Sequence, residues 1–202
     1  MSKSKYKKLL IIVLFIISMT SCNKQPNYPV TPQIEFVESK KFTLLGNIDS
    51  VYVKIKFKDG DGNLGLNSFD APKEEFTLID TIKNLPYDDF NCENFITING
   101  DRDTVKIFRN PTYFNFFVTF YKKNINGTYT KIIRPDCRKN NGRFSRFDPD
   151  KGYSGALEGF IEYNFKGSFS QEFKNTTVQL EIYIMDRALN ESNRIRTSDI
   201  KF

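Results

Sequence analysis

The chain has 202 residues with 20 phenylalanines and 10 tyrosines, no tryptophan, no histidine and a formal charge of +6. The lack of histidine nearly excludes Ser-His-Asp and Cys-His nucleophile systems, and it removes a usual zinc ligand and the commonest general base. Glu158 and Glu162 would lie roughly 13 Å apart on one strand, which is too far for a glycosidase pair. We therefore expect a protein that is not an enzyme, with a carboxylate or Ser-Lys hydrolase as the catalytic alternative.

An export signal occupies the start of the chain. Four lysines precede an unbroken apolar run from Leu9 to Ile17, which is shorter than the roughly 20 residues that span a bilayer. The next residues, Ser18 to Cys22, resemble the lipobox of bacterial lipoproteins, and the Ser-Cys pair is common in lipoproteins of the Bacteroidota. The resemblance implies a signal peptide over residues 1–21 and lipidation at Cys22. Ordinary secretion, or an uncleaved anchor, is the alternative.

Removal of this leader changes the charge of the chain. Loss of its four lysines leaves 26 basic and 24 acidic residues, so the nearly neutral mature chain gives no reason to expect nucleic-acid binding. The remaining cysteines, Cys92 and Cys137, would close a loop of about 45 residues. A disulfide between them would contribute roughly 4 kcal/mol in an oxidising compartment. Free buried thiols are the alternative.

The mature chain begins with a proline-rich tether, residues 22–32, and continues as one domain over residues 33–202. A short first strand is predicted over Gln33 to Val37. Val51 to Lys58 then alternates between apolar and polar residues, which is typical of a half-buried antiparallel strand.

A glycine-rich loop, Phe57 to Asp70 (FKDGDGNLGLNSFD), begins where this strand stops. Counted from Asp59, oxygen side chains stand at positions 1, 3, 5 and 12: Asp59, Asp61, Asn63 and Asp70. Hard cations such as Ca²⁺ prefer six to eight oxygens, so this spacing predicts a calcium loop that resembles an EF-hand. It departs from that pattern at Leu64, where glycine is expected, and in its flanking strands. A plain Asp-Gly turn is the alternative.

The middle of the chain is less regular. Residues 74–109 are predicted to form an insertion with its own hairpins, and Tyr113 to Arg134 a hairpin that turns near Asn126 and Gly127. Arg134 to Tyr153 is a basic loop with two possible interpretations. It either binds a partner, or it is a solvated loop whose two phenylalanines, Phe144 and Phe147, are tucked in.

Two more alternating strands, Leu157 to Phe165 and Val178 to Ile184, precede Asp186-Arg-Ala-Leu-Asn190-Glu-Ser, and Arg194 to Phe202 returns as a last strand. This ending resembles the closing hairpin of bacterial immunoglobulin-like and cadherin-like domains. Together with the strand that enters the DGDG loop, it is similar to small outer-membrane lipoproteins of the Bacteroidota. The resemblance implies an all-β fold, an immunoglobulin-like antiparallel β-sandwich with an insertion.

The same resemblance bears on the calcium site and on modification. If the two loops meet at one end of the sandwich, Asp186 and Asn190 would complete the site; a turn held by the Asp and Asn side chains is the alternative. Three Asp-Ser/Thr-aliphatic triplets match the O-glycosylation signal of that phylum, with acceptors at Ser50, Thr81 and Thr104.

These observations predict a non-catalytic, lipid-anchored outer-membrane protein that faces either the periplasm or the cell surface. Its expected role is binding or assembly, as an accessory subunit with a protein partner in an outer-membrane complex. The alternative is a glycan-binding surface lipoprotein for nutrient capture, which would use outward-facing Tyr52, Phe160 and Tyr183.

Overall fold

The computed structural model describes residues 26–45, 48–67, 76–82, 93–98, 101–109, 112–133, 140–147, 155–167 and 169–202. These residues form strands and one four-residue helix, so the predicted all-β class is confirmed. The strands are β1 (Gln33–Thr43), β2 (Asp49–Asp59), β3 (Phe76–Ile82), β4 (Glu93–Ile98), β5 (Asp101–Arg109), β6 (Phe116–Lys123), β7 (Tyr129–Lys131), β8 (Leu157–Gly167), β9 (Thr177–Ile184), β10 (Ile195–Arg196) and β11 (Ile200–Lys201), and the helix is α2 (Phe169–Glu172).

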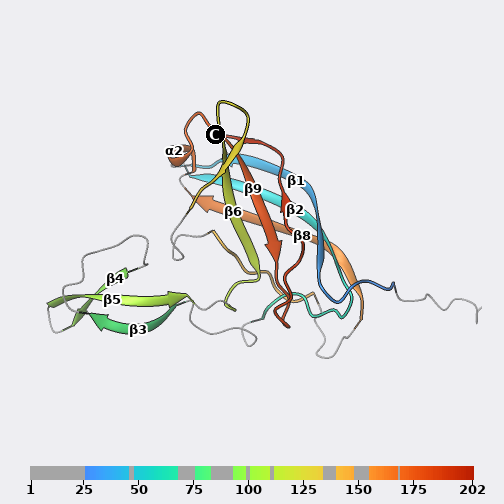
Figure 1. The fold of residues 1–202 in the computed structure, drawn as a ribbon, viewed down its shortest axis with the longest axis horizontal. Coiled ribbons are helices and arrows are strands. Elements are labelled where there is room, and N and C mark those ends of the chain that lie inside the picture. The colour runs from blue at the N-terminus through green and yellow to red at the C-terminus, as the bar shows by residue number, and fades with distance from the viewer. Residues whose placement is uncertain are drawn as a thin grey trace, which may run out of the picture.

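Two antiparallel sheets share one apolar core. The first sheet has the order β1-β2-β8, and the second has the order β10-β9-β6-β7, with β11 also paired to β9. In Figure 1, β6 and β9 lie over the first sheet and cross its strands obliquely. Phe116 of β6 joins the layers, since its ring stacks on Tyr163 of β8 with the centroids 4.8 Å apart. The buried residues of both sheets belong to a single cluster.

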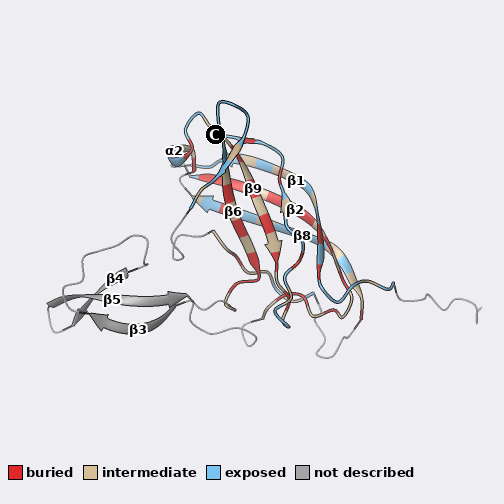
Figure 2. Ribbon diagram, viewed as in Figure 1, coloured by how far each residue is buried: buried red, intermediate tan, exposed pale blue. Residues whose placement is uncertain are grey.

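Strand β2 carries the predicted alternation. Val51, Val53, Ile55 and Phe57 are at most 2% exposed, while the residues between them are half-buried. Figure 2 shows the same alternation of buried and partly exposed residues along β6 and β9. The strand extends one or two residues beyond its predicted ends, and it starts and finishes with a fully buried aspartate, Asp49 and Asp59.

Two predicted strands were wrong in extent. The first strand continues through Glu38 to Thr43, which are polar except for Phe42. Among the described strands β1 pairs only with β2, so it is an edge strand, and its register shifts between Phe36 and Glu38. The last strand is divided into β10 and β11 at Thr197, which is buried. The hydroxyl of Thr197 accepts a hydrogen bond from the amide of Leu180 (3.0 Å), so a side chain replaces part of the backbone ladder.

The predicted β6–β7 hairpin is present, and Gly127 in its turn has a φ of 83°, which favours glycine. Part of the basic loop, residues 140–147, is tied to the sandwich. The backbone of Phe144 forms two hydrogen bonds with the side-chain amide of Asn115: its nitrogen donates to Oδ1 (2.9 Å) and its carbonyl accepts from Nδ2 (3.0 Å). Phe144 also packs against the core, and Phe147 contacts Phe57 with the ring centroids 4.7 Å apart.

Strands β3, β4 and β5 form a third sheet in the order β3-β5-β4. They fall within the predicted insertion, residues 74–109, and among the described strands they pair only with one another.

Replacing Phe116 with alanine should reduce the free energy of unfolding by about 3 to 5 kcal/mol, because the ring is fully buried between the two sheets. Ile125→Ala is the matched control, since Ile125 is fully exposed in the β6–β7 turn, and its effect should stay within about 0.5 kcal/mol. Urea denaturation measures both. Equal effects of the two substitutions would contradict the described core.

Candidate metal centre

The first loop of the site begins where β2 ends. Gly62 and Gly65 have φ values of 71° and 89°, a conformation that residues with a Cβ rarely adopt. Leu64 lies between them and is 0% exposed, so it anchors the loop in the core. This explains the departure from the EF-hand pattern: an apolar anchor occupies the position of the EF-hand glycine, and the turn is made one residue later.

The second loop follows β9 and presents Asp186, which is 2% exposed. Asn190 fixes this carboxylate. Its backbone amide donates to Asp186 Oδ1 (2.7 Å), and its side-chain amide donates to Oδ2 (2.8 Å). Asp186 therefore has a defined orientation before any ligand arrives.

The two loops meet. The amide of Arg187 donates to the carbonyl of Asn63 (3.3 Å), and its guanidinium donates to the carbonyl of Leu64 (3.3 Å). Asp59, Asp61 and Asp186 each bring one carboxylate oxygen to within 4.8 Å of the other two. Three anionic oxygens at this separation could hold one metal ion.

Asp59 is the unusual member of this group. It is 0% exposed, and neither of its oxygens has a hydrogen-bond partner among the described residues. Burial, with the nearby charges of Asp61 and Asp186, raises the pKa of Asp59 from 3.8 to about 6. The backbone amides of Asn63 and Gly62 lie near Asp59 and oppose that shift, but neither forms a hydrogen bond of good geometry with it. The Asn63 amide donates instead to Asp61 Oδ1 (3.4 Å).

Asn63 adds a further oxygen. Its side-chain amide donates to Asp61 Oδ2 (2.9 Å), which leaves Oδ1 of Asn63 buried and without a partner in the described part of the chain. Buried polar atoms in proteins are nearly always satisfied. The unsatisfied oxygens of Asp59 and Asn63 could therefore be ligands to a cation.

The structure places the other predicted site residues as follows. Asn190 lies behind Asp186 and donates to it through both nitrogens. Ser50 is buried near the start of β2, so a glycan there would require that end of the strand to open. Thr81 and Thr104 lie in β3 and β5. Cys22, Asp70, Cys92 and Cys137 lie outside the described residues. For Thr81 and Thr104 the structure describes the backbone but not the side chain.

The glutamates considered for hydrolysis face solvent. Glu158 accepts a hydrogen bond from the Tyr28 hydroxyl (2.8 Å), and Glu162 forms an ion pair with Lys54 (2.8 Å). The three aromatic residues considered for a glycan platform do not all lie on one sheet. Tyr52 and Phe160 are in the first sheet, whereas Tyr183 is in the second and is covered by Arg194, whose guanidinium is 3.9 Å from the ring centroid.

One serine–lysine contact was missed by the sequence analysis. Lys41 Nζ donates to Ser170 Oγ (3.1 Å), and Ser170 Oγ donates in turn to the buried Asp49 (2.8 Å). The amide of Ser170 also donates to Asp49, so the group caps α2.

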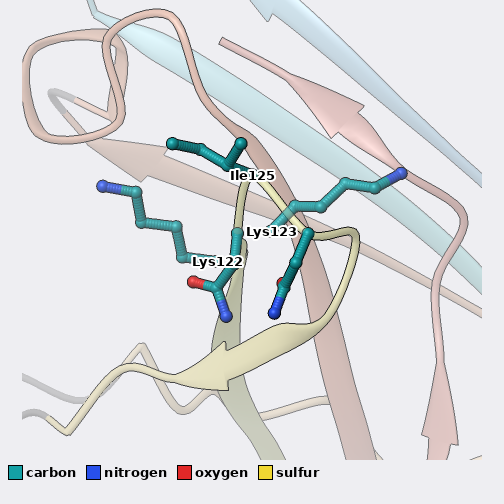
Figure 3. A pocket seen from close by; sticks show the side chains of 5 residues that line it. Lys122, Lys123 and Ile125 are labelled. Carbon is teal, nitrogen blue, oxygen red and sulfur yellow. The ribbon is translucent and has the colours of Figure 1, made fainter.

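A surface hollow lies at the β6–β7 turn, away from the acidic cluster. Figure 3 shows its lining, which consists of Lys122, Lys123, Asn124, Ile125 and Asn126. Lys122 and Lys123 end β6, whereas Asn115, just before β6, accepts a hydrogen bond from Met185, the neighbour of Asp186. The length of β6 therefore separates the hollow from the candidate metal centre.

Comparison of the chain with protein-family models, with curated proteins and with solved structures finds no match in any of the three. Within the described ranges, no helix has the length and apolar character needed to cross a membrane.

The raised pKa of Asp59 predicts how the stability of the ion-free protein depends on pH. Because this pKa is about 6 in the folded chain and 3.8 ordinarily, the folded state holds more protons than the unfolded state between these values. The contribution of Asp59 to the free energy of unfolding should be greatest below about pH 4 and should fall by roughly 3 kcal/mol as the pH rises to 7.

Urea denaturation in the presence of a chelator, from pH 3.5 to 7.5, measures this dependence. Asp59→Asn is the control, since it keeps the shape of the side chain and removes the titrating group. The fall in stability should shrink in that variant. Identical pH profiles for the two proteins would show that Asp59 is not the responsible group.

Proposed function

We propose that this chain is a non-catalytic, immunoglobulin-like β-sandwich that is stabilised by calcium, anchored to the outer membrane by lipid on Cys22, and used for binding or assembly. The observation that carries the calcium part is the Asp59 carboxylate, which is fully buried beside two other carboxylates and lacks a hydrogen-bond partner in the described residues.

The donor set favours calcium among the common cations. All the candidate ligands are hard oxygens: the carboxylates of Asp59, Asp61 and Asp186 and the amide oxygen of Asn63. Calcium binds oxygens at about 2.3 to 2.6 Å in flexible geometry, so its opposite ligands lie up to about 5 Å apart. The three carboxylate oxygens lie within 4.8 Å of one another, a separation that a calcium ion can bridge.

The immunoglobulin-like assignment rests on two supports. The D-x-A-x-N-x-S ending resembles the closing hairpin of bacterial immunoglobulin-like and cadherin-like domains, and together with the strand that enters the DGDG loop it is similar to outer-membrane lipoproteins of the Bacteroidota. The chain also forms two antiparallel sheets around one core, and the two motifs lie in loops that contact each other.

A protein partner is supported by the outer face of the second sheet. Tyr183 is stacked between Phe117, with ring centroids 4.6 Å apart, and the guanidinium of Arg194. Tyr121 is covered in the same way by Arg196, at 3.8 Å from its ring centroid. Tyrosine and arginine are enriched at protein interfaces, where rigid aromatic surface is buried at low entropic cost. A glycan-binding role would rest on Tyr52 and on Phe160, which is 52% exposed.

Calcium should raise the melting temperature of the purified protein. A ligand that binds only the folded state at 100 times its Kd stabilises it by about 2.7 kcal/mol, which corresponds to roughly 5 to 10 °C for a domain of this size. Differential scanning calorimetry with calcium and with a chelator measures the shift. Asp59→Asn and Asp186→Asn should each lose most of it.

Asp199→Asn is the matched control, because Asp199 is an exposed aspartate that pairs with Lys123 at the far end of β6. It should keep the full calcium shift. If calcium still raises the melting temperature of both Asp59→Asn and Asp186→Asn, the calcium site lies elsewhere. If calcium does not raise the melting temperature of the parent protein, the proposed calcium site is contradicted.

The binding and anchoring parts are tested together in the native membrane. Full-length protein extracted in mild detergent should carry a stoichiometric envelope protein, identified by mass spectrometry. Cys22→Ala should move the protein from the membrane to the soluble fraction, because a diacylated cysteine supplies the anchor. Recovery of the protein alone would contradict the assembly role, and a Cys22→Ala protein still bound to membranes would contradict the lipid anchor.

A further inference from the structure

The segment that leads into the domain packs on the candidate metal loop. A Cβ placed on Gly60 would lie 2.3 Å from the carbonyl oxygen of Tyr28 and 2.7 Å from that of Pro29. These contacts are with backbone atoms, which cannot rotate away. Gly60 stands between the candidate ligands Asp59 and Asp61, so the segment rests on the backbone that joins them.

The side chain of Tyr28 adds a second contact. Its ring lies beneath the ammonium group of Lys58, which is 5.5 Å from the ring centroid, and its hydroxyl donates to Glu158 (2.8 Å). Lys58 and Glu158 face each other across β2 and β8, one position before Asp59. The tyrosine is therefore fixed to the strands that support the metal loop.

The second loop holds the same segment from the other side. Asn193 forms two hydrogen bonds with the backbone of Ile34: Oδ1 accepts from the amide (2.8 Å), and Nδ2 donates to the carbonyl (2.9 Å). Asn193 follows Ser192, whose hydroxyl accepts from the amide of Ile184, just before Asp186. Residues 28–34 are thus held by both loops that contribute carboxylates to the site.

We propose that cation binding at Asp59, Asp61 and Asp186 locks residues 28–34 onto the domain and so sets the free length of the tether. This inference rests on the proposed calcium site. With the ion bound, the carboxylates on both sides of Gly60 are drawn to one centre and the surface under Tyr28 and Pro29 is fixed. Without the ion, the carboxylates repel one another and the buried Asp59 carboxylate must be hydrated, so the loop opens. The surface on which Tyr28 and Pro29 pack is then no longer fixed.

Release changes how far the domain reaches from its lipid. An extended chain spans at most about 3.3 to 3.6 Å per residue. Release of residues 28–34 adds seven residues to the tether, which lengthens its extended reach by up to about 23 to 25 Å. Calcium would therefore hold the domain close to the membrane, and calcium loss would let it extend.

The test uses the full-length lipidated protein in detergent micelles, with calcium and with a chelator. Hydroxyl-radical oxidation reports the exposure of Tyr28, and hydrogen exchange reports the amide of Ile34. Chelation should raise Tyr28 oxidation severalfold and remove the protection of Ile34. Oxidation of Tyr129, which bonds to Asp199 at the other end of the sandwich, should not change.

The melting temperature, measured on the same samples, separates the two proposals. If calcium raises the melting temperature but leaves Tyr28 and Ile34 unchanged, the inference is overturned and the calcium site stands. If calcium changes none of these quantities, both are overturned.

Two variants isolate the contact. Gly60→Ala should expose Tyr28 even with calcium present, whereas Gly127→Ala should not, because its backbone strain is confined to the β6–β7 turn at the other end of the sandwich. Glu158→Ala changes an exposed residue and leaves the loop intact, so it should increase Tyr28 oxidation in calcium while the calcium-induced rise in melting temperature remains. A docked Tyr28 in both Gly60→Ala and Glu158→Ala would contradict the proposed contact.

Discussion

Two aspartates are fully buried at the two ends of β2, and they differ in their hydrogen-bond partners and in the charges beside them. Asp49 accepts hydrogen bonds from Ser170 and lies 3.7 Å from Lys41. Burial alone would raise the pKa of Asp49, but these partners outweigh burial and lower it. Asp59 has two carboxylates as neighbours and no donor among the described residues. Isolated buried charge is costly, so the arrangement around Asp59 is favourable when its carboxyl group is protonated or when a positive charge is supplied.

The rest of that end of the sandwich is built around the Asp59 loop. Gly65 lies so close to the backbone of Ser145 that a Cβ added to it would be 2.3 Å from the Ser145 carbonyl oxygen. Leu66, the next residue, donates to the carbonyl of Phe144 (3.0 Å). Arg187 reaches the same loop from the turn after β9. Segments from several parts of the chain therefore depend on one short loop, and the charge at its centre affects how all of them pack.

Much of this fold follows from alternation in the sequence, because a strand with one face in the core must place apolar residues at every second position. That rule locates β2, β8 and β9. It fails for the second half of β1, where an edge strand rich in lysine has little apolar surface to bury, and for Thr197, whose hydroxyl takes over a backbone hydrogen bond. The motifs around Asp59 and Asp186 indicate ligands in both loops. They leave open whether Asn190 is a ligand or holds the turn, and the structure shows it as a donor to Asp186. They do not reveal that Tyr28 packs on Gly60, since residue type alone does not indicate that pairing.

The loops that share the acidic cluster are far apart along the chain, as Arg187 and Leu64, which bond across them, are separated by 123 positions. Closing a loop of that length costs about 4 kcal/mol of chain entropy, and contacts of this kind form late in folding. A chain that emerges N-terminus first exposes Asp59 and Asp61 long before Asp186 is available to meet them. Ion capture is then possible only when the last strands have joined the second sheet, so the ion would mark the completed fold and not help to start it.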